Sequence, residues 1–211
     1  MIRAATWLAH SGLLAGLLLA HCVLAAEPPR PVLEVAGDDF PDLIVLLPRF
    51  TPDGTQLPLA CDQVRPRRID ELDPRWRRAV GRIHLDCESM ETDDEGVSTV
   101  ATVITAFLNP GAVRMASLPV AEIRLMDSDL WSDHQFVLPT AYAQAGKVLR
   151  AHVEQRCRLA QDSPGLIGRR DCRVTEEADG MFIETGAFGG IWVYPDPLDP
   201  QRTVYAESWA D

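Results

Sequence analysis

The sequence lacks the motifs by which most enzymes are recognised. It contains no G-x-S-x-G elbow of a serine hydrolase, and its Gly-rich stretch 186–190 has neither a lysine nor a following helix to hold phosphate. The cysteines show no C-x-x-C spacing, which disfavours zinc. Lysine is almost absent, Lys147 being the only one, and this bias indicates a GC-rich bacterial genome rather than a mechanism. No motif here implies a cofactor.

Long apolar runs are also missing beyond the N-terminus. Arg3 precedes an apolar stretch centred on 13–19, and small residues then close it. This pattern predicts a secretory signal over residues 1–25. A membrane span needs about 20 apolar residues, so an uncleaved anchor is the weaker alternative and no transmembrane segment is expected after cleavage. A lipid anchor at Cys22 is disfavoured because His21 is the wrong residue to precede a lipidated cysteine.

Charge is dominated by one sign. The chain carries 31 acidic and 20 basic residues, a net charge of −11. Cleavage of the signal would remove Arg3 as its one charged residue and bring the net charge to −12. Such acidity argues against nucleic acid as a partner and favours a basic one. We expect a flexible leader over residues 26–42 and a single domain over 43–211, long enough for a full hydrophobic core.

Four cysteines remain after the signal, an even number that predicts two disulfides in an exported chain. They are Cys61, Cys87, Cys157 and Cys172. Four cysteines allow three pairings, of which we favour the sequential one, Cys61–Cys87 and Cys157–Cys172, because each pair flanks one local unit. Closing the 15-residue loop of the second pair is worth about 3 kcal/mol in the chain-entropy model.

Hydrophobic periodicity predicts an α+β fold made mainly of antiparallel sheet. Apolar and polar residues alternate from Arg82 to Glu88, as in a half-buried strand. A β-branched strand at 97–108 leads to Asn109-Pro110-Gly111, a type II turn, and a returning strand over 113–118. Residues 120–126 and 135–138 suggest another strand pair.

One helix is expected over about 140–160, with Thr140 as its cap. Its apolar residues recur at helical spacing, namely Tyr142, Ala145, Val148, Leu149, Val153, Cys157 and Ala160. The C-terminal part predicts a β-meander, with a hairpin at Asp179-Gly180 and a Pro/Asp loop over 195–200.

The acidic stretch 127–134 is the main candidate for catalysis or metal binding. Its potential ligands are Asp127, Asp129, Asp133 and His134, and the last three could instead serve an acid–base hydrolase. The stretch departs from the calcium-loop template at positions five and six. Neighbouring strand residues also point to opposite faces. We therefore favour a plain hairpin loop, with no catalytic residue and no metal.

Aromatic and acidic residues near the C-terminus are the candidates for binding. Proline fixes φ at three positions within 195–200, so this loop is stiff and loses little entropy on binding. Rigid aromatic side chains also dominate binding hot spots. The expected contact residues are Trp131, Trp192, Tyr194, Asp196 and Asp199.

The leading hypothesis is an exported, non-catalytic binding protein of the Gram-negative periplasm or the exterior. Its partner would be another envelope or secreted protein of basic character, as for an inhibitor or immunity protein that neutralises an envelope-acting enzyme or toxin. A small envelope hydrolase that uses the carboxylate/His or metal site is one alternative. A structural envelope factor is another.

Overall fold

The structure is a computed structural model of the chain. It describes residues 32–37, 39–41, 43–46, 61–90, 99–127, 131–161, 172–177, 179–184 and 189–210. All of these belong to a compact unit that spans Pro31–Asp211. The expected signal over 1–25 lies outside the described residues and stays a prediction.

Strands make up most of the described chain. The strands before the long helix are β1 (Leu33–Val35), β2 (Ile44–Leu46), β3 (Arg65–Pro66), β4 (Val80–Met90), β5 (Thr99–Leu108), β6 (Val113–Met115), β7 (Leu118–Pro119), β8 (Glu122–Asp127) and β9 (Trp131–Leu138). The strands after it are β10 (Thr175–Glu177), β11 (Gly180–Glu184), β12 (Gly189–Asp196) and β13 (Asp199–Ala210). The α-helices are α1 (Pro74–Ala79) and α2 (Tyr142–Gln161).

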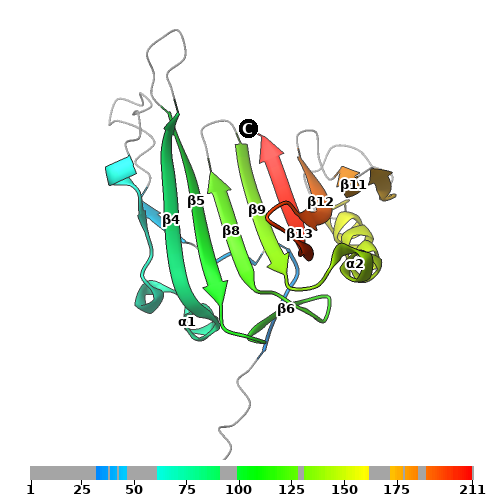
Figure 1. Cartoon of the computed structure of the whole chain (residues 1–211), viewed down its shortest axis with the longest axis horizontal. Helices are drawn as coiled ribbons and strands as arrows, with labels where there is room; N and C mark the ends of the chain where they lie inside the picture. The colour runs from blue at the N-terminus through cyan, green and yellow to red at the C-terminus, as the bar shows by residue number, and fades with distance from the viewer. Residues whose placement is uncertain are drawn as a thin grey trace, which may run out of the picture. The chain divides into compact units, whose positions relative to one another are not determined.

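Eight strands form the main sheet, in the order β10-β11-β12-β13-β9-β8-β5-β4 (Figure 1). Every neighbouring pair in it is antiparallel. The α+β fold with a C-terminal meander that the sequence predicts is therefore confirmed. The alternation expected in β4 is also seen, because Ile83, Leu85 and Cys87 are half-buried while the residues between them are exposed.

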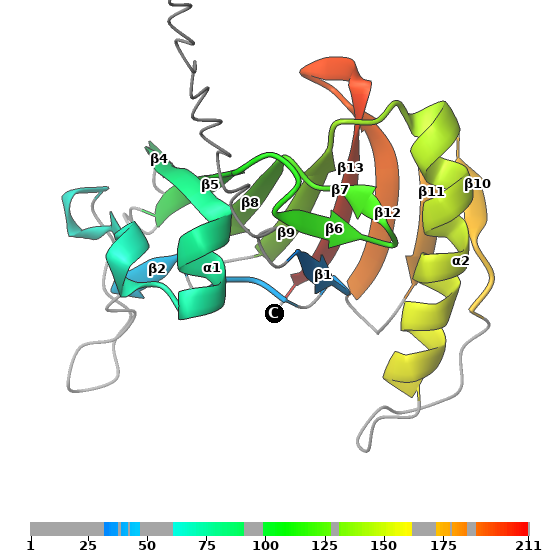
Figure 2. The ribbon, with the colours of Figure 1, turned by 90° about the horizontal axis from the view of Figure 1, so that it is seen from below.

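The two faces of this sheet differ in what covers them. The helix face carries Ile123, Phe136 and Tyr205, which join the main hydrophobic core together with α2 and β6. We call the opposite face the turn face, because the turn between β12 and β13 covers part of it. Figure 2 shows β1 and α1 on one side of the sheet and the β12–β13 hairpin rising on the other.

The long helix packs by the periodicity that predicts it. Ala145, Leu149 and Val153 are fully buried against the helix face. Val148, which the sequence places in the same apolar stripe, is 42% exposed. The helix begins at Tyr142, so Thr140 does not cap it.

The turn after β5 has the expected geometry. Gly111 has a φ of +70°, and the Ala112 N–H donates to the Asn109 carbonyl at 3.0 Å, as a type II turn requires. The single returning strand expected over 113–118 is wrong, because Ala116 and Ser117 both have positive φ and divide it into the hairpin β6–β7. Non-glycine residues rarely adopt this conformation, so the sequence carries no turn signal there.

The segment expected as a leader contributes one strand to the folded unit. Leu33–Val35 forms β1, which pairs in parallel with β6. Val35 is buried, and the Glu34 carboxylate accepts a hydrogen bond from the Ser117 N–H at 2.8 Å. Part of the 26–42 segment is thus ordered by the domain that follows it.

Both disulfides form with the predicted pairing. Cys61–Cys87 ties a 3-10 turn to the edge strand β4, and Cys157–Cys172 ties the end of α2 to the chain that precedes β10. Such bridges are typical of proteins that fold in an oxidising compartment. No described helix is both long and apolar enough to cross a membrane.

Candidate functional site: a pocket at the bend of β12

The strand β12 bends sharply at its end. In the sheet, β13 and β9 lie between β12 and β8, a separation of roughly 14 Å at the usual strand spacing. Yet a guanidinium nitrogen of Arg124 on β8 lies 3.0 Å from the carboxylate of Asp196 at the end of β12. The turn that follows must therefore fold across the turn face. The pairing register shifts between Pro195 and Asp196, where the bend occurs.

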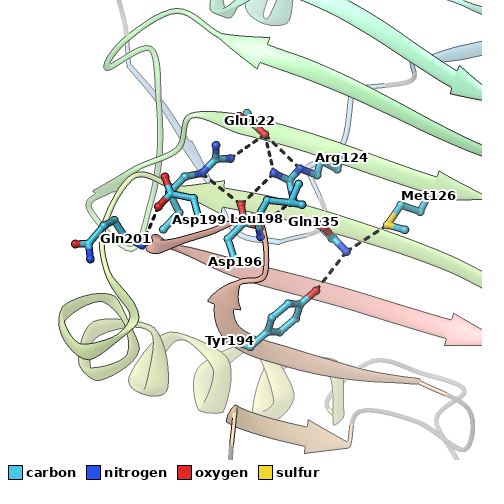
Figure 3. Close-up of polar contacts among 10 residues, drawn as sticks. Glu122, Arg124, Met126, Gln135, Tyr194, Asp196, Leu198, Asp199 and Gln201 are labelled. Atoms are coloured by element: carbon cyan, nitrogen blue, oxygen red, sulfur yellow. Dashed lines mark hydrogen bonds and ion pairs between the residues drawn. The ribbon is translucent and has the colours of Figure 1, made fainter.

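Four charged side chains hold the bent turn against the sheet, and we call them the charge quartet: Glu122, Arg124, Asp196 and Arg202 (Figure 3). Arg124 donates to the Glu122 carboxylate at 3.0 Å and to Asp196 at 3.0 Å. Arg202 forms ion pairs with the same two carboxylates at 2.8 and 3.4 Å. Two positive and two negative charges thus balance one another.

Burial makes this charge balance necessary. The Asp196 side chain is fully buried, and those of Glu122 and Arg124 are only 12% and 14% exposed. Burial alone would lower the pKa of Arg124, but the hydrogen bonds and charges of Asp196 and Glu122 more than offset it, so the pKa is raised. The guanidinium therefore stays charged. Asp196 also accepts the Leu198 N–H at 3.1 Å, which shapes the turn itself.

A small apolar cluster lies under the bent turn. Val137, Val204 and Ala206 are almost fully buried on the turn face and pack with Trp192 and Tyr194. Phe182 on β11 extends this cluster, since its ring centre lies 4.4 Å from that of Trp192. The bend thus gives the turn face a second core of its own.

Polar side chains continue from Tyr194 along the turn face. The Gln135 amide nitrogen lies 3.3 Å from the Tyr194 hydroxyl and donates to the Asp133 carboxylate at 2.6 Å (Figure 3 shows the contact with Tyr194). The Ser208 hydroxyl donates to the other Asp133 oxygen at 2.8 Å. Burial raises the pKa of Asp133 despite these two hydrogen bonds. Burial, assisted by the Asp133 charge, also raises the pKa of Tyr194 to about 12, so this phenol stays protonated.

A pocket of about 430 Å³ opens where β12 bends away from the β10–β11 hairpin. Its lining residues are Glu177, Asp179, Gly180, Met181, Trp192, Val193, Tyr194, Pro195, Asp196, Pro197 and Pro200. Gly180 is required at its border, because a Cβ there would lie 2.4 Å from the Val193 carbonyl oxygen. Two aromatic residues and three prolines are among the lining residues, and both residue types keep their shape when a ligand binds.

Three of the five expected binding residues line this pocket: Trp192, Tyr194 and Asp196. Asp199 lies beside them across the turn, where it pairs with Asp196 and accepts the Gln201 N–H at 3.0 Å. Trp131 is not brought to this site. Its backbone pairs with Ala210 at the far end of β13, roughly 35 Å along the strand from the turn.

The residues of the alternative catalytic or metal-binding set that the structure describes do not come together. Asp133 pairs with Met126 on the turn face, whereas the next residue, His134, projects to the helix face, where its ring lies 4.2 Å from that of Phe40. Asp127 ends β8, and Asp129 lies outside the described residues. Within the part of the chain that the structure describes, no three His, Cys, Asp or Glu side chains group as a metal site would require.

Sequence reasoning missed the quartet's other members, Glu122, Arg124 and Arg202. One signal was present, because Glu122 and Arg124 put opposite charges on one face of an otherwise apolar strand. Arg124 meets Asp196 across two intervening strands only because β12 bends. No local sequence pattern reveals that bend. No family model, curated protein or solved structure matches this chain.

Proposed function

We propose that this protein is an exported, non-catalytic binding protein of the periplasm that holds a protein partner in the pocket at the bend of β12. An inhibitor or immunity protein against an envelope-acting enzyme or toxin would act in this way. The observation that carries the proposal is the pocket itself, a stiff aromatic and proline surface beside the buried charge quartet. Binding to such a surface costs little conformational entropy.

Three further features support this role. The two disulfides are those of a chain that folds outside the reducing cytosol. The acidic net charge of −11 favours encounter with a basic partner. Two of the polar residues that line the pocket are engaged within the protein, since Asp196 accepts a hydrogen bond from Arg124 and Tyr194 contacts Gln135. This arrangement suits recognition better than acid–base chemistry.

The test of export is fractionation of a Gram-negative host that expresses the full chain. We expect the protein in the periplasmic fraction, with an intact mass that lacks the first 25 or so residues and with four cysteines blocked to alkylation. A retained N-terminus or four reactive thiols would contradict the proposal.

The test of binding compares captured partners between variants. The wild type should retain one stoichiometric partner from envelope extract, and the purified pair should reassociate. Trp192→Ala and the milder Trp192→Leu remove the aromatic wall and should lose that partner, whereas Leu159→Ala, at an exposed apolar site on α2, should keep it. Equal retention by Trp192→Ala, or no stoichiometric partner at all, would refute the proposed function.

A further inference from the structure

Among the described residues, the side chains that line the pocket are acidic, aromatic or apolar, and none of them is basic. Its lining includes three carboxylates, from Glu177, Asp179 and Asp196, but no lysine, arginine, amide or serine/threonine hydroxyl. The apolar side chains of the lining that are not buried in the main core are those of three prolines and the rings of Trp192 and Tyr194, whereas Met181 and Val193 belong to that core. A ligand that fits this surface needs an apolar body and a positive charge.

The carboxylates divide into one that is neutralised and two that are not. Asp196 is fully buried, accepts a hydrogen bond from Arg124 and forms an ion pair with Arg202 in the quartet. Glu177 and Asp179 are exposed beside the β10–β11 turn, and neither has an ion-pair partner among the described residues. The neighbouring Glu176 differs, because it pairs with Arg150 of α2. Within the described part of the chain, the pocket therefore carries two negative charges that no basic side chain neutralises.

We propose that the pocket takes one basic side chain, an arginine or a lysine, from the partner protein. This inference rests on the proposed function and adds to it the chemistry of the contact. The aliphatic stem packs against the rings of Trp192 and Tyr194, where long basic side chains bury their methylenes. The cationic head reaches Glu177 and Asp179, and the electron-rich ring faces add a cation–π attraction.

Other ligand classes fit the same surface less well. A neutral sugar needs donors and acceptors for its hydroxyls, and the side chains of the lining offer only carboxylates, the tyrosine hydroxyl and the indole N–H. An anionic ligand would be repelled by Glu177 and Asp179 without a cation in the lining to offset them. The basic side chain satisfies both the charge and the apolar surface.

The experiment titrates the folded, oxidised protein with short capped peptides and follows backbone amide and indole signals by NMR. The probes are Ac-Gly-Arg-Gly-NH₂, Ac-Gly-Lys-Gly-NH₂, the uncharged norleucine peptide of the same length and a neutral chito-oligosaccharide. The basic peptides should shift signals of Trp192 and Val193 and should bind about tenfold more tightly than the norleucine peptide. Raising the salt concentration from about 50 mM to about 300 mM should weaken the binding of the basic peptides, because salt screens exposed charges.

A pair of double variants separates local charge from net charge. Glu177→Gln with Asp179→Asn should abolish the preference for the basic peptides. Asp62→Asn with Glu88→Gln changes the net charge equally at the opposite edge of the sheet, and it should retain the preference. Both pairs replace exposed side chains, so we expect both proteins to fold.

Several outcomes would overturn the inference. The first is a norleucine peptide that shifts the pocket signals as strongly as the arginine peptide. The second is a sugar that binds where the basic peptides do not, and the third is an absence of shifts with either basic peptide at millimolar concentration. The Trp192→Ala capture experiment judges the proposed function separately, so a pocket that holds an uncharged part of a partner would leave that function standing.

Discussion

The helix face and the turn face are built from alternate residues of the same strands, but they are stabilised differently. On the helix face, Phe136 and Tyr205 are fully buried in a large apolar core under α2. On the turn face, the apolar group whose burial the structure describes is Val137, Val204 and Ala206, and four charged side chains cover it with the bent turn. The first face needs another layer of the fold, whereas the second is covered by its own hairpin.

This difference shows how a sheet can acquire a pocket without a second domain. Packing on the helix face is non-directional, so it fixes the strands but no particular loop. The ion pairs of the turn face are directional and fix one loop in one position. That loop includes Asp196, which also lines the pocket. The ion pairs of the quartet therefore help to fix the shape of the pocket.

The largest expected effect tests the helix face. Phe136→Ala removes a fully buried ring. The centre of this ring lies 4.6 Å from that of Phe40, and the ring packs edge-on to that of Tyr205. Truncation of a buried phenylalanine costs about 3–5 kcal/mol. Urea unfolding with the disulfides intact should show this loss in the free energy of unfolding. A loss under about 1 kcal/mol would contradict tight packing around Phe136 on this face.

The next effect tests the charge quartet. Asp196→Ala leaves Arg124 and Arg202 without their shared carboxylate, and breaking one partner of a buried ion pair costs about 3 kcal/mol. The turn should then detach, so the NMR signals of Val204 and Tyr194 should shift. Asp199→Asn is the matched control on the same turn, because asparagine can still accept the Gln201 N–H. Equal stability of the two variants would show that the quartet does not hold the turn.

A third, smaller effect tests whether the apolar cluster of the turn face contributes to stability. Val204→Ala deletes two methyl groups from a side chain that is fully buried beneath the turn. At about 0.8 kcal/mol per buried carbon, with a small cavity term, we expect a loss of about 2 kcal/mol. A loss of about 0.5 kcal/mol or less would indicate a solvated face, as at most surface positions.

The smallest effect concerns Asp133 and has the opposite sign. Burial raises the pKa of its carboxyl in the folded protein above the ordinary value of 3.8. The folded state therefore holds this proton more tightly than the unfolded state, and the associated stability is lost as the pH rises through the raised pKa. Asp133→Asn should thus be more stable than the wild type at neutral pH.

The measurement for Asp133 is the difference in unfolding free energy between the two proteins across pH. The advantage of Asp133→Asn should shrink as the pH falls through the raised pKa and should level off below 3.8, where the aspartic acid becomes neutral in both states. Asparagine keeps an oxygen that can accept a hydrogen bond from Gln135 or Ser208. An advantage that does not change with pH would contradict burial as the cause.

The sequence predicts much of the fold because many of its signals are local. The disulfide pairing, α2, the type II turn and the hairpin at Asp179-Gly180 all depend on residues close to one another in the chain. The hairpin at Ala116-Ser117 could not be predicted, because these residues adopt positive φ without the usual asparagine or glycine. There the structure is imposed by tertiary contacts, including the carboxylate of Glu34.

The candidate site divides in the same way. Trp192, Tyr194 and Asp196 come to one pocket because they alternate along a single strand, which a period of two already indicates. Glu177 and Asp179 reach it from another hairpin, and Arg124 and Arg202 support it through the bend of β12. Those contributions depend on how the strands are ordered and curved, and no local pattern contains that information.

The two disulfides lie at opposite margins of the main sheet. Cys61–Cys87 anchors β4 at one edge, and Cys157–Cys172 anchors the approach to β10 at the other. The central strands β8, β9 and β13 carry no disulfide and are held by packing, by the hydrogen bonds of the sheet and by the ion pairs of the charge quartet. Reduction should therefore loosen the sheet from its borders inward, and the amide protons of β9 and β13 should be the last to exchange with deuterium.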